Sequence, residues 1–504
     1  MVKVGNLVLR GLYRDSVQLM EATESLKKMA NVVEAAVVMG TESNREMLRE
    51  MGLLTGEGLT AGPNDIIIAV AAEKDVEHLL EAGRRIVVAG RRPSTRYRLE
   101  QALDMGVDIA SISIPGKYVG DLASALLERG VNLFIFSDHV PLDVEVKLKR
   151  KAYERGLLVM GPEAGTSIVD GYGFGFANVV RRGPVGVVGS AGSGIQEVTT
   201  LLDAYGVGVS HALGVGGRDL SEPVGGLMTA EALRRLEKDP QTKVIALVAK
   251  HSDEKTVAKV LERAEIRKPL YLSLLGMGRT SVAGFKNIPT LHGLALALCG
   301  EVGGEAYERA VHSLEEEVGV LEKAVEKGGE LGGFYCGGTL ATETAFIWKS
   351  LGVEVSSNIG VQWVRRLSDG NRSEGATVVD YGSEDFTEGR PHPIIDPSLR
   401  NQRVVSELNS GRSGVVVMDL ITGYGAPDNI VEKTVEQLAR VRAGRLVVHV
   451  VGTPNDPQWG SLEMLGRLPA VRVSSNALAA AFAAASGLGD GKIISMVVDQ
   501  LVVG

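Results

Sequence analysis

Residues 184–198 read PVGVVGSAGSGIQEV, and this stretch decides the fold class. Val185–Val188 is a short apolar run, which is typical of a parallel strand buried on both faces. The small residues of Ser190–Gly194 follow it, and Ile195–Tyr205 then has the pattern of a helix. A strand, a glycine-rich loop and a helix in this order predict one unit of a Rossmann-like or flavodoxin-like parallel sheet.

The same alternation runs through almost the whole chain. Amphipathic stretches such as Asp143–Arg155 and Thr229–Lys238 separate short apolar runs. This rhythm predicts an α/β protein with several parallel-sheet domains. The runs predicted as strands are Ile66–Val70, Ile109–Ile114, Leu133–Phe136, Leu157–Met160, Val185–Val188, Val244–Val248, Leu270–Leu275, Val415–Met418, Leu446–Val451 and Ile493–Val498.

A second glycine-rich unit resembles the first. Residues 331–343 read LGGFYCGGTLATE, so the loop Cys336–Thr339 follows the apolar run Gly333–Tyr335. The helical pattern Leu340–Ser350 comes next. Two such units predict duplicated flavodoxin-like halves.

These patterns predict five segments of the chain. Residues 1–62 are expected to form a small N-terminal α+β unit of the βαβ type, with a helix capped by Asp15 or Ser16 and a strand at Val33–Met39. Residues 63–182 are expected to form a Rossmann-like domain, and residues 183–304 a flavodoxin-type domain. A helical linker over 305–330 then leads to a second flavodoxin-type domain over 331–504.

Composition narrows the classes of partner. The 54 Lys and Arg residues against 62 Asp and Glu residues give a formal charge of −8, which does not favour nucleic acid or an anionic membrane as partner. The two cysteines, Cys299 and Cys336, argue for a reducing compartment. No apolar run of about 18 residues and no signal peptide are visible, so a cytoplasmic protein without a membrane span is expected. No metal-ligand spacing or Walker A loop is present either.

The two glycine-rich loops are candidate phosphate sites. Backbone N–H groups converge at a helix N-terminus, and the helix dipole favours an anion there. The alternative is a pair of tight turns that bind nothing. Cys336 lies beside the second loop, where a small packing role is the more common one for a buried cysteine. The residues predicted to bind phosphate are Ser190, Ala191, Gly192, Ser193, Gly194, Gly337, Gly338 and Thr339.

Two further segments concentrate charged side chains. Arg218 and Asp219 follow the predicted strand Val207–Leu213, where an arginine can hold a carboxylate; the alternative is a structural ion pair. The segment Asp380–Arg403 has three prolines and is expected to be a fixed, non-helical loop. It supplies His392 and Arg390 as candidate catalytic residues and Asp396 and Arg400 as candidate substrate-binding residues, and the alternative is again a structural loop whose charges pair with each other.

Three parts of the chain resemble succinyl-CoA synthetase. Ser137–Glu163 resembles the end of the CoA-binding domain of the α chain, and Gly186–Gly217 with Glu237–Thr242 resembles the ligase domain that follows. Residues from Gly332 onward resemble the matching domain of the β chain. The resemblance implies a CoA-binding-like domain at 63–182, an α-chain-like ligase domain at 183–304 and a β-chain-like ligase domain at 331–504.

Over its whole length the chain is identified as a member of the FdrA family. The most specific stretches are Gly161-Pro162, Gly165-Thr166-Ser167, Gly194-Ile195-Gln196-Glu197, Gly216-Gly217-Arg218-Asp219-Leu220, Gly337-Gly338-Thr339-Leu340, Gly389-Arg390-Pro391-His392-Pro393, Ile395-Asp396-Pro397 and Leu399-Arg400-Asn401-Gln402.

The chain departs from the synthetases at the phosphohistidine. Their Gly-His-Ala-Gly motif is replaced by Gly276-Met277-Gly278-Arg279-Thr280-Ser281, and Lys250, before His251, stands where a synthetase carboxylate supports the histidine. His292 lies elsewhere and does not inherit the phosphohistidine role. An ATP-grasp domain and the N-terminal phosphate loop for CoA are not recognisable, so no cofactor is assigned and CoA is an open possibility.

Members of the FdrA family are associated with purine-nitrogen catabolism, where they resemble the large subunit of an oxamate carbamoyltransferase. The resemblance implies a subunit that holds an acyl or carbamoyl phosphate and passes the group to a small carboxylate acceptor, together with partner subunits or a second copy. Two alternatives remain: an acyl-CoA synthetase or CoA-binding protein of the succinate–CoA ligase superfamily, and a non-catalytic scaffold with a ligase fold.

Overall fold

The computed structural model describes residues 2–12, 14, 16–89, 99–250, 252–388 and 390–503. The chain divides into two compact units, Met1–Ala102 and Leu103–Gly504. Asp15, one of the two predicted caps of the first helix, lies outside the described residues. Among the described residues no helix is long and apolar enough to cross a membrane.

The first unit is built on a three-stranded antiparallel sheet in the order β1-β3-β2. β3 is the central strand and is fully buried, with its Ala69 opposite Asn6 of β1 and Ala36 of β2. The predicted boundary at residue 62 is therefore wrong, because the central strand comes after it. The elements are β1 (Lys3–Leu9), α1 (Ser16–Lys27), β2 (Val32–Met39), α2 (Glu42–Glu50), η1 (Gly56–Thr60), β3 (Ile66–Ala72) and α3 (Val76–Ala89), with α4 (Leu99–Asp104) at the junction.

The second unit begins with a small parallel sheet in the order β4-β5-β6. Within the expected Rossmann-like domain, residues 63–182, this sheet covers residues 109–160. Its elements are β4 (Ile109–Ile112), η2 (Gly116–Tyr118), α5 (Val119–Glu128), β5 (Asn132–Ile135), α6 (Leu142–Glu154) and β6 (Val159–Met160).

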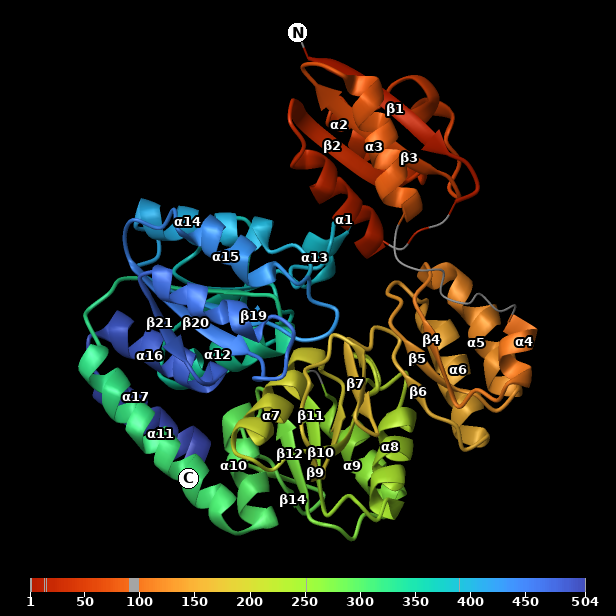
Figure 1. Ribbon diagram of the computed structural model, residues 1–504. Helices are drawn as coiled ribbons and strands as arrows, with labels where there is room; N and C mark the ends of the chain where they lie inside the picture. Colours follow the sequence, from red (N-terminus) through yellow and green to blue (C-terminus); the bar gives the residue numbers. More distant parts are fainter. Residues whose placement is uncertain are drawn as a thin grey trace. The chain divides into compact units, whose positions relative to one another are not determined.

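A six-stranded sheet follows, in the order β12-β11-β9-β10-β7-β8, and we call residues 165–304 the first half (Figure 1). β9, β10, β11 and β12 are parallel, whereas β7 and β8 are antiparallel additions at one edge. The elements are β7 (Thr166–Val169), β8 (Tyr172–Gly175), β9 (Arg182–Gly189), α7 (Gly192–Ala204), β10 (Val209–Gly214), α8 (Leu227–Lys238), β11 (Val244–Ala249), α9 (Glu254–Ala264), β12 (Leu270–Leu274), β13 (Ser281–Val282), β14 (Phe285–Lys286) and α10 (Leu291–Val302).

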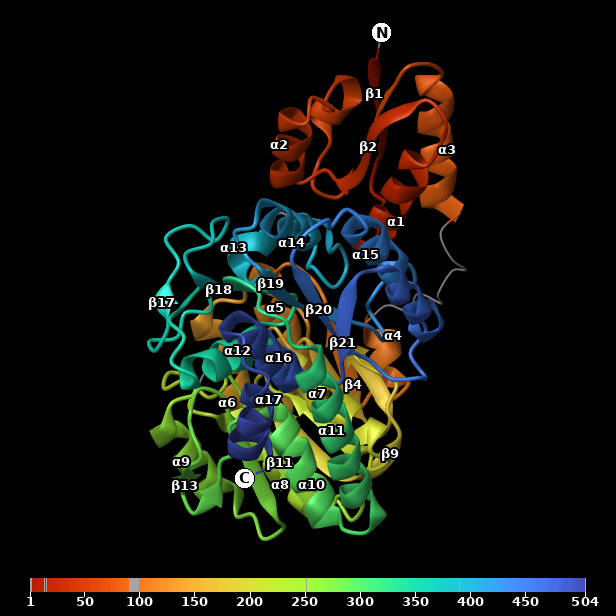
Figure 2. The same cartoon turned by 90° about the vertical axis from the view of Figure 1, so that its left-hand side faces the viewer.

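A wholly parallel seven-stranded sheet in the order β17-β16-β18-β15-β19-β20-β21 forms the second half, residues 331–503. Helix α11 (Glu305–Ala324) joins the two halves and packs beside α10 and α17, as Figures 1 and 2 show. The elements are β15 (Leu331–Tyr335), α12 (Gly338–Ser350), β16 (Val355–Ser357), β17 (Arg365–Arg366), β18 (Ala376–Asp380), α13 (Glu384–Thr387), α14 (Ser398–Ser410), β19 (Val415–Ile421), α15 (Ile430–Leu438), β20 (Arg445–Val451), η3 (Trp459–Arg467), β21 (Ala470–Val473), α16 (Asn476–Leu488), α17 (Lys492–Val497) and η4 (Val498–Val503).

Two local predictions are corrected. Residues 492–503 are helical and contain no strand, because Ile494 and Val497, three residues apart, face the core while Met496 is exposed. A short apolar run alone does not distinguish such a helix from a buried strand. The segment Asp380–Arg403 is also partly helical, since α13 lies within it and α14 begins at Ser398.

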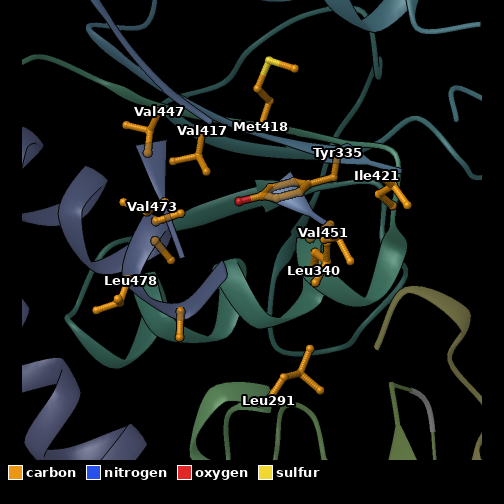
Figure 3. Close-up of a cluster of buried hydrophobic side chains, with 14 of the residues drawn as sticks. Leu291, Tyr335, Leu340, Val417, Met418, Ile421, Val447, Val451, Val473 and Leu478 are labelled. Carbon is orange, nitrogen blue, oxygen red and sulfur yellow. The ribbon is translucent and has the colours of Figure 1, made fainter. Parts of the chain in front are cut away.

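The two halves share one hydrophobic core. Leu291 of the first half belongs to the same buried cluster as Tyr335, Leu340 and Val451 of the second half (Figure 3). Burial of apolar surface contributes about 25 cal/mol per Å². The halves therefore form one continuous body.

Candidate functional site

Both glycine-rich loops lie at the carboxyl ends of central strands. β9 is paired on both sides by parallel strands and leads through Ser190 and Ala191 into α7. β15 is likewise paired on both sides and leads through Cys336 and Gly337 into α12. Ligands of open parallel sheets bind at this edge.

The first turns of α7 and α12 touch each other. A Cβ added to Gly194 would lie 2.8 Å from Cγ2 of Thr339, and one added to Gly337 would lie 2.5 Å from Cβ of Ser193. Such distances leave no room for a side chain on either glycine. The two loops therefore lie in contact.

Hydrogen-bond donors are left over at both helix starts. Neither α7 nor α12 has a side-chain cap. The hydroxyl of Ser190 is buried and has no partner among the described residues. A helix start without a cap leaves N–H groups that an anion can accept from.

Part of the second loop is already occupied by a protein carboxylate. Asp419, inside β19, accepts hydrogen bonds from the N–H groups of Cys336 at 2.7 Å and Gly337 at 2.9 Å. The predicted phosphate donor Gly337 is therefore used internally. Gly338 and Thr339 are the members of this loop that can still donate.

Arg400 also serves this internal cluster. Its side chain is 1 % exposed, and its Nη1 lies 2.8 Å from Oδ1 of Asp419 and 2.9 Å from Sγ of Cys336. Burial raises the pKa of the Cys336 thiol well above its ordinary value, which disfavours a thiolate nucleophile. The structure thus gives Arg400 a structural partner in place of the predicted substrate.

Lys250 and Asp380 converge on the start of α12. A Cβ on Gly338 would lie 2.2 Å from Oδ2 of Asp380 and 2.7 Å from Nζ of Lys250. Lys250 directly follows β11 of the first half, and Asp380 ends β18 of the second half. Burial raises the pKa of Asp380, and the charge of Lys250 opposes that rise. The site therefore brings one cation from the first half to the helix N-terminus of the second half.

His392 lies next to this cluster as a neutral imidazole. Burial, with a further contribution from Lys250, lowers its pKa to about 4. Its Nδ1 accepts from the N–H of Ile394 at 3.2 Å, which leaves the proton on Nε2. Nε2 lies 2.7 Å from the place that a Cβ on Gly382 would take, and the ring packs against Phe176. His392 is therefore a hydrogen-bond donor at the edge of the site.

The other predicted residues lie away from the two loops or are paired. Arg218 bonds Glu145 at 2.8 Å, and Asp219 pairs with the buried Lys149 at 2.8 Å while it caps α8 through Thr229. Asp396 accepts from Ser398 and from Lys433 at 3.1 Å. Arg390 is exposed, and Gly389 before it lies outside the described residues.

His292 is a core residue. Its Nε2 lies 2.7 Å from the hydroxyl of Tyr205 and its Nδ1 2.8 Å from the hydroxyl of Ser475. Burial lowers its pKa to about 4. Both ring nitrogens are used, so His292 is not free to carry phosphate. His251 lies outside the described residues.

Sequence reasoning missed Asp380 and Asp419 as members of this cluster. Each lies in a strand whose other residues are all apolar or Thr, and each is buried. A carboxylate inside an apolar run is rare unless it has a partner or a function. That signal was available in the sequence.

Known families match three parts of the chain. "CoA binding domain" matches residues 180–268, which lie in the first half and overlap the segment 63–182, expected to carry that role, only at residues 180–182. "CoA-ligase" matches residues 334–485 in the second half. "AllF, heavy metal-associated domain" matches residues 2–100.

The N-terminal unit has no thiolate ligand for a soft metal. Residues 2–100 contain no cysteine and a single histidine, His78, whereas heavy-metal sites rely on thiolates. No group of three metal-ligating side chains occurs in the described part of the chain. No metal step is therefore assigned to this unit.

The fold and the matched domains define a succinate–CoA-ligase-like protein. The α subunit of an ADP-forming succinate–CoA ligase from Aquifex aeolicus is 27 % identical over 35 % of this chain and 59 % of its own length. The ADP-forming sulfoacetate–CoA ligase subunit SauD from Bilophila wadsworthia is 30 % identical over 44 % of this chain and 78 % of its own length.

A third relative covers nearly the whole molecule. The uncharacterized protein YahF of Escherichia coli K12 is 36 % identical over 88 % of this chain and 90 % of its own length. The chain belongs to the YahF-like FdrA family, as the resemblance implied.

Proposed function

We propose that the chain is a subunit of an acyl-CoA-synthetase-type enzyme that holds an acyl phosphate between α7 and α12 and transfers the acyl group without a phosphohistidine. The observation that carries the proposal is the meeting of two uncapped helix starts beside Lys250. Helix dipoles and N–H groups stabilise an anion, and a lysine adds a full charge.

The geometry gives each group a chemical role. The free N–H groups at the starts of α7 and α12 bind the phosphate oxygens, and Lys250 neutralises the charge that develops as phosphate departs. The bond between the acyl carbon and the phosphate oxygen breaks, and the acceptor forms the new bond to that carbon. The acceptor's proton leaves with the phosphate. His392, protonated on Nε2, donates to an oxygen of the reacting group.

CoA is the acceptor that the relatives favour. Both named relatives with a described activity are CoA ligase subunits. Those relatives are subunits, so additional chains or a second copy of this chain are part of the proposal. A small carboxylate, CoA and ATP are then the substrates of the complete enzyme, and another chain makes the acyl phosphate from the carboxylate and ATP, since both relatives are ADP-forming.

Transfer of a carbamoyl group to a small carboxylate such as oxamate is the second candidate. The observation in its favour is Lys250, a cation where the synthetases have a carboxylate. In this reaction the amide nitrogen of the acceptor bonds to the carbamoyl carbon, and phosphate leaves with the proton. A non-catalytic scaffold is the third outcome that the test must recognise.

The test is calorimetric binding of phosphate, acetyl phosphate, carbamoyl phosphate, CoA and oxamate to the full chain. The Lys250→Met variant removes the charge and keeps the length of the side chain. Lys147→Met is the matched control, since Lys147 is exposed and pairs with the exposed Asp143. We expect acyl phosphates to bind wild type and the control alike, and the Lys250 variant about tenfold more weakly, as for the loss of one charged contact of about 1.4 kcal/mol.

The acceptor is decided in the same experiment. Binding of CoA supports the synthetase, and binding of oxamate only in the presence of carbamoyl phosphate supports the carbamoyltransferase. If no phosphorylated ligand binds the full chain, the proposal is overturned and a non-catalytic scaffold is the remaining function.

A further inference from the structure

Two buried glutamates occupy equivalent places on the two helices of the site. Glu197 lies five residues after Gly192, the first residue of α7, and Glu343 lies five residues after Gly338, the first residue of α12. Both are at most 1 % exposed. The proposed chemistry uses neither carboxylate, and burying a carboxylate costs free energy unless it is paired.

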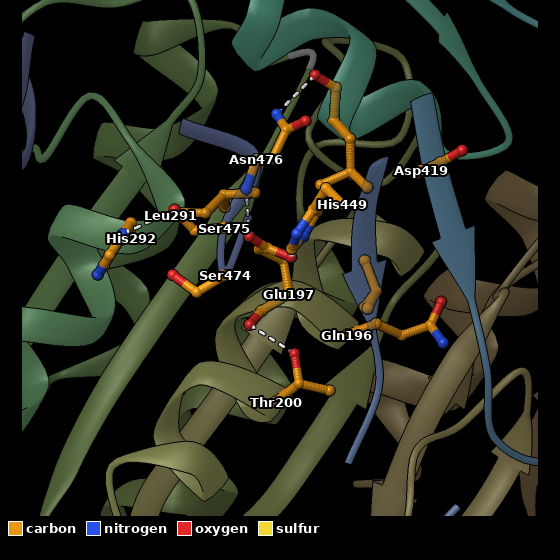
Figure 4. Close-up of polar contacts among 12 residues, drawn as sticks. Gln196, Glu197, Thr200, Leu291, His292, Asp419, His449, Ser474, Ser475 and Asn476 are labelled. Carbon is orange, nitrogen blue, oxygen red and sulfur yellow. Dashed lines mark hydrogen bonds and ion pairs between the residues drawn. The ribbon is translucent and has the colours of Figure 1, made fainter. Parts of the chain in front are cut away.

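The side chain of Glu197, from the first half, is bound by two groups of the second half. Its Oε2 lies 2.6 Å from Nε2 of His449 on β20, and its Oε1 accepts from the N–H of Asn476 at 3.0 Å (Figure 4). Asn476 is the first residue of α16, whose cap is Ser475. The carboxylate therefore sits at a helix N-terminus of the opposite half, where the dipole favours it.

Glu343, from the second half, makes the reciprocal contact. Its Oε1 accepts from the N–H of Leu291 at 2.6 Å, and Leu291 is the first residue of α10 in the first half, capped by Thr290. Its Oε2 accepts from Nδ2 of Asn476 at 2.7 Å. Asn476 thus touches both glutamates, one through its backbone and one through its side chain.

The charges of this cluster are coupled. Desolvation lowers the pKa of His449, but the charge and hydrogen bond of Glu197 outweigh this and raise it above its ordinary value. Burial and then the charge of Glu197 raise the pKa of Glu343 to about 7. The interface therefore contains the ion pair between Glu197 and His449. It also contains the Glu343 carboxyl group, which retains its proton more readily than an ordinary glutamate.

We propose that Glu197 and Glu343 are positioning residues that lock the first turns of α7 and α12 together across the interface between the two halves. This inference rests on the proposed function in one point, because the two locked turns are the two sides of the proposed acyl phosphate site. Each helix start is held in register because its glutamate, little more than one turn further along, is fixed to the N-terminus of a helix in the other half.

The test compares Glu197→Gln, Glu343→Gln and the double variant with Asp203→Asn. Glutamine keeps the shape but replaces one acceptor oxygen by a donor group. Asp203 is a matched control on α7 itself, since it is buried and its carboxylate, within the described part of the chain, bonds only Arg181 of its own half. All variants are made in the full chain.

The first readout is hydrogen exchange of the backbone amides of residues 195–198 and 341–344, which are the first amides of α7 and α12 that are protected by intrahelical hydrogen bonds. We expect either glutamate variant to raise exchange in both segments by about tenfold, and the control in neither, because tenfold corresponds to about 1.4 kcal/mol of local opening. Faster exchange confined to the helix that carries the substitution would overturn the lock. This readout needs no ligand, so it stands even if wild type binds no phosphate and the proposed function fails.

The second readout is the affinity for inorganic phosphate, compared between the wild type and the variants. It applies once the wild type has been shown to bind phosphate. The lock predicts a Kd about tenfold higher in each glutamate variant and little further change in the double variant, because both act on one contact. Phosphate affinity unchanged in both single variants, with only the melting temperature lowered as in Asp203→Asn, would reduce the two glutamates to ordinary core residues and refute the proposal.

Discussion

Replacing Gly338 by alanine tests the site at its tightest point. The new Cβ would lie 2.2 Å from Oδ2 of Asp380 and 2.7 Å from Nζ of Lys250. An ordinary contact needs 3.4 Å or more, so the Asp380 oxygen must move by about 1.2 Å. Its other oxygen is held at 2.8 Å by the N–H of Gly382, so the movement strains or breaks that bond.

The substitution affects both the stability of the fold and the affinity for phosphate. Overpacking lowers the free energy of unfolding by about 1–3 kcal/mol, and the higher helix propensity of alanine raises it by up to about 1 kcal/mol. The net loss of stability is therefore about 0–3 kcal/mol. Displacing Lys250 from the helix start removes one charge-assisted contact of about 1.5–3 kcal/mol, which predicts about 10- to 100-fold weaker phosphate binding.

Gly192 provides the matched control, since it is the first residue of α7 as Gly338 is of α12. A Cβ on Gly192 would lie 3.4 Å from Cα of Gly165 and 3.5 Å from Oγ1 of Thr166, which the structure tolerates. Titration calorimetry with phosphate compares the two variants. Phosphate affinity at the wild-type level in Gly338→Ala, or an equal loss in Gly192→Ala, would refute the reasoning.

Two further predictions concern buried charges. Arg400→Gln leaves the Asp419 carboxylate without its cation in the interior and should lower the free energy of unfolding by about 3–5 kcal/mol. Arg390→Ala at the surface should change it by less than about 0.5 kcal/mol, and denaturant unfolding measures both. An Arg400 variant of unchanged stability that has lost only acceptor binding would contradict this and show that Arg400 binds the substrate. Glu343 keeps its proton in the folded state up to about pH 7 but loses it near pH 4.5 when unfolded, so its contribution is present below pH 4.5 and is lost as the pH rises to 7, by up to about 3 kcal/mol. Glu343→Gln should therefore flatten the pH dependence of unfolding in this window, and an unchanged slope would contradict the raised pKa.

The sequence predicts the local units better than their long-range pairing. The loops at Ser190 and Gly338 follow from a strand, small residues and a helix, all within 20 residues. The boundary at residue 62 failed because β3 pairs antiparallel with two earlier strands, and no local pattern records such a pairing. Helix α17 was taken for a strand because a six-residue apolar run carries too little periodicity.

The candidate site shows the same limit. The sequence places Arg400 in a charged segment but cannot show that Asp419, in the next strand, takes its charge. Lys250 was noticed as a replacement, yet only the folded chain brings it to Gly338, 88 positions away. The glutamate pair was missed because its partners are contributed by the other half of the chain.

Helix α11 has a consequence for assembly. In the succinate–CoA ligase relative the matching region is a separate α subunit, whereas here one 20-residue helix connects both halves. A covalent connection of this length replaces a concentration-dependent encounter by an intramolecular one, with an effective concentration set by the tether. The two halves are therefore always made in equal numbers, and dilution does not separate them.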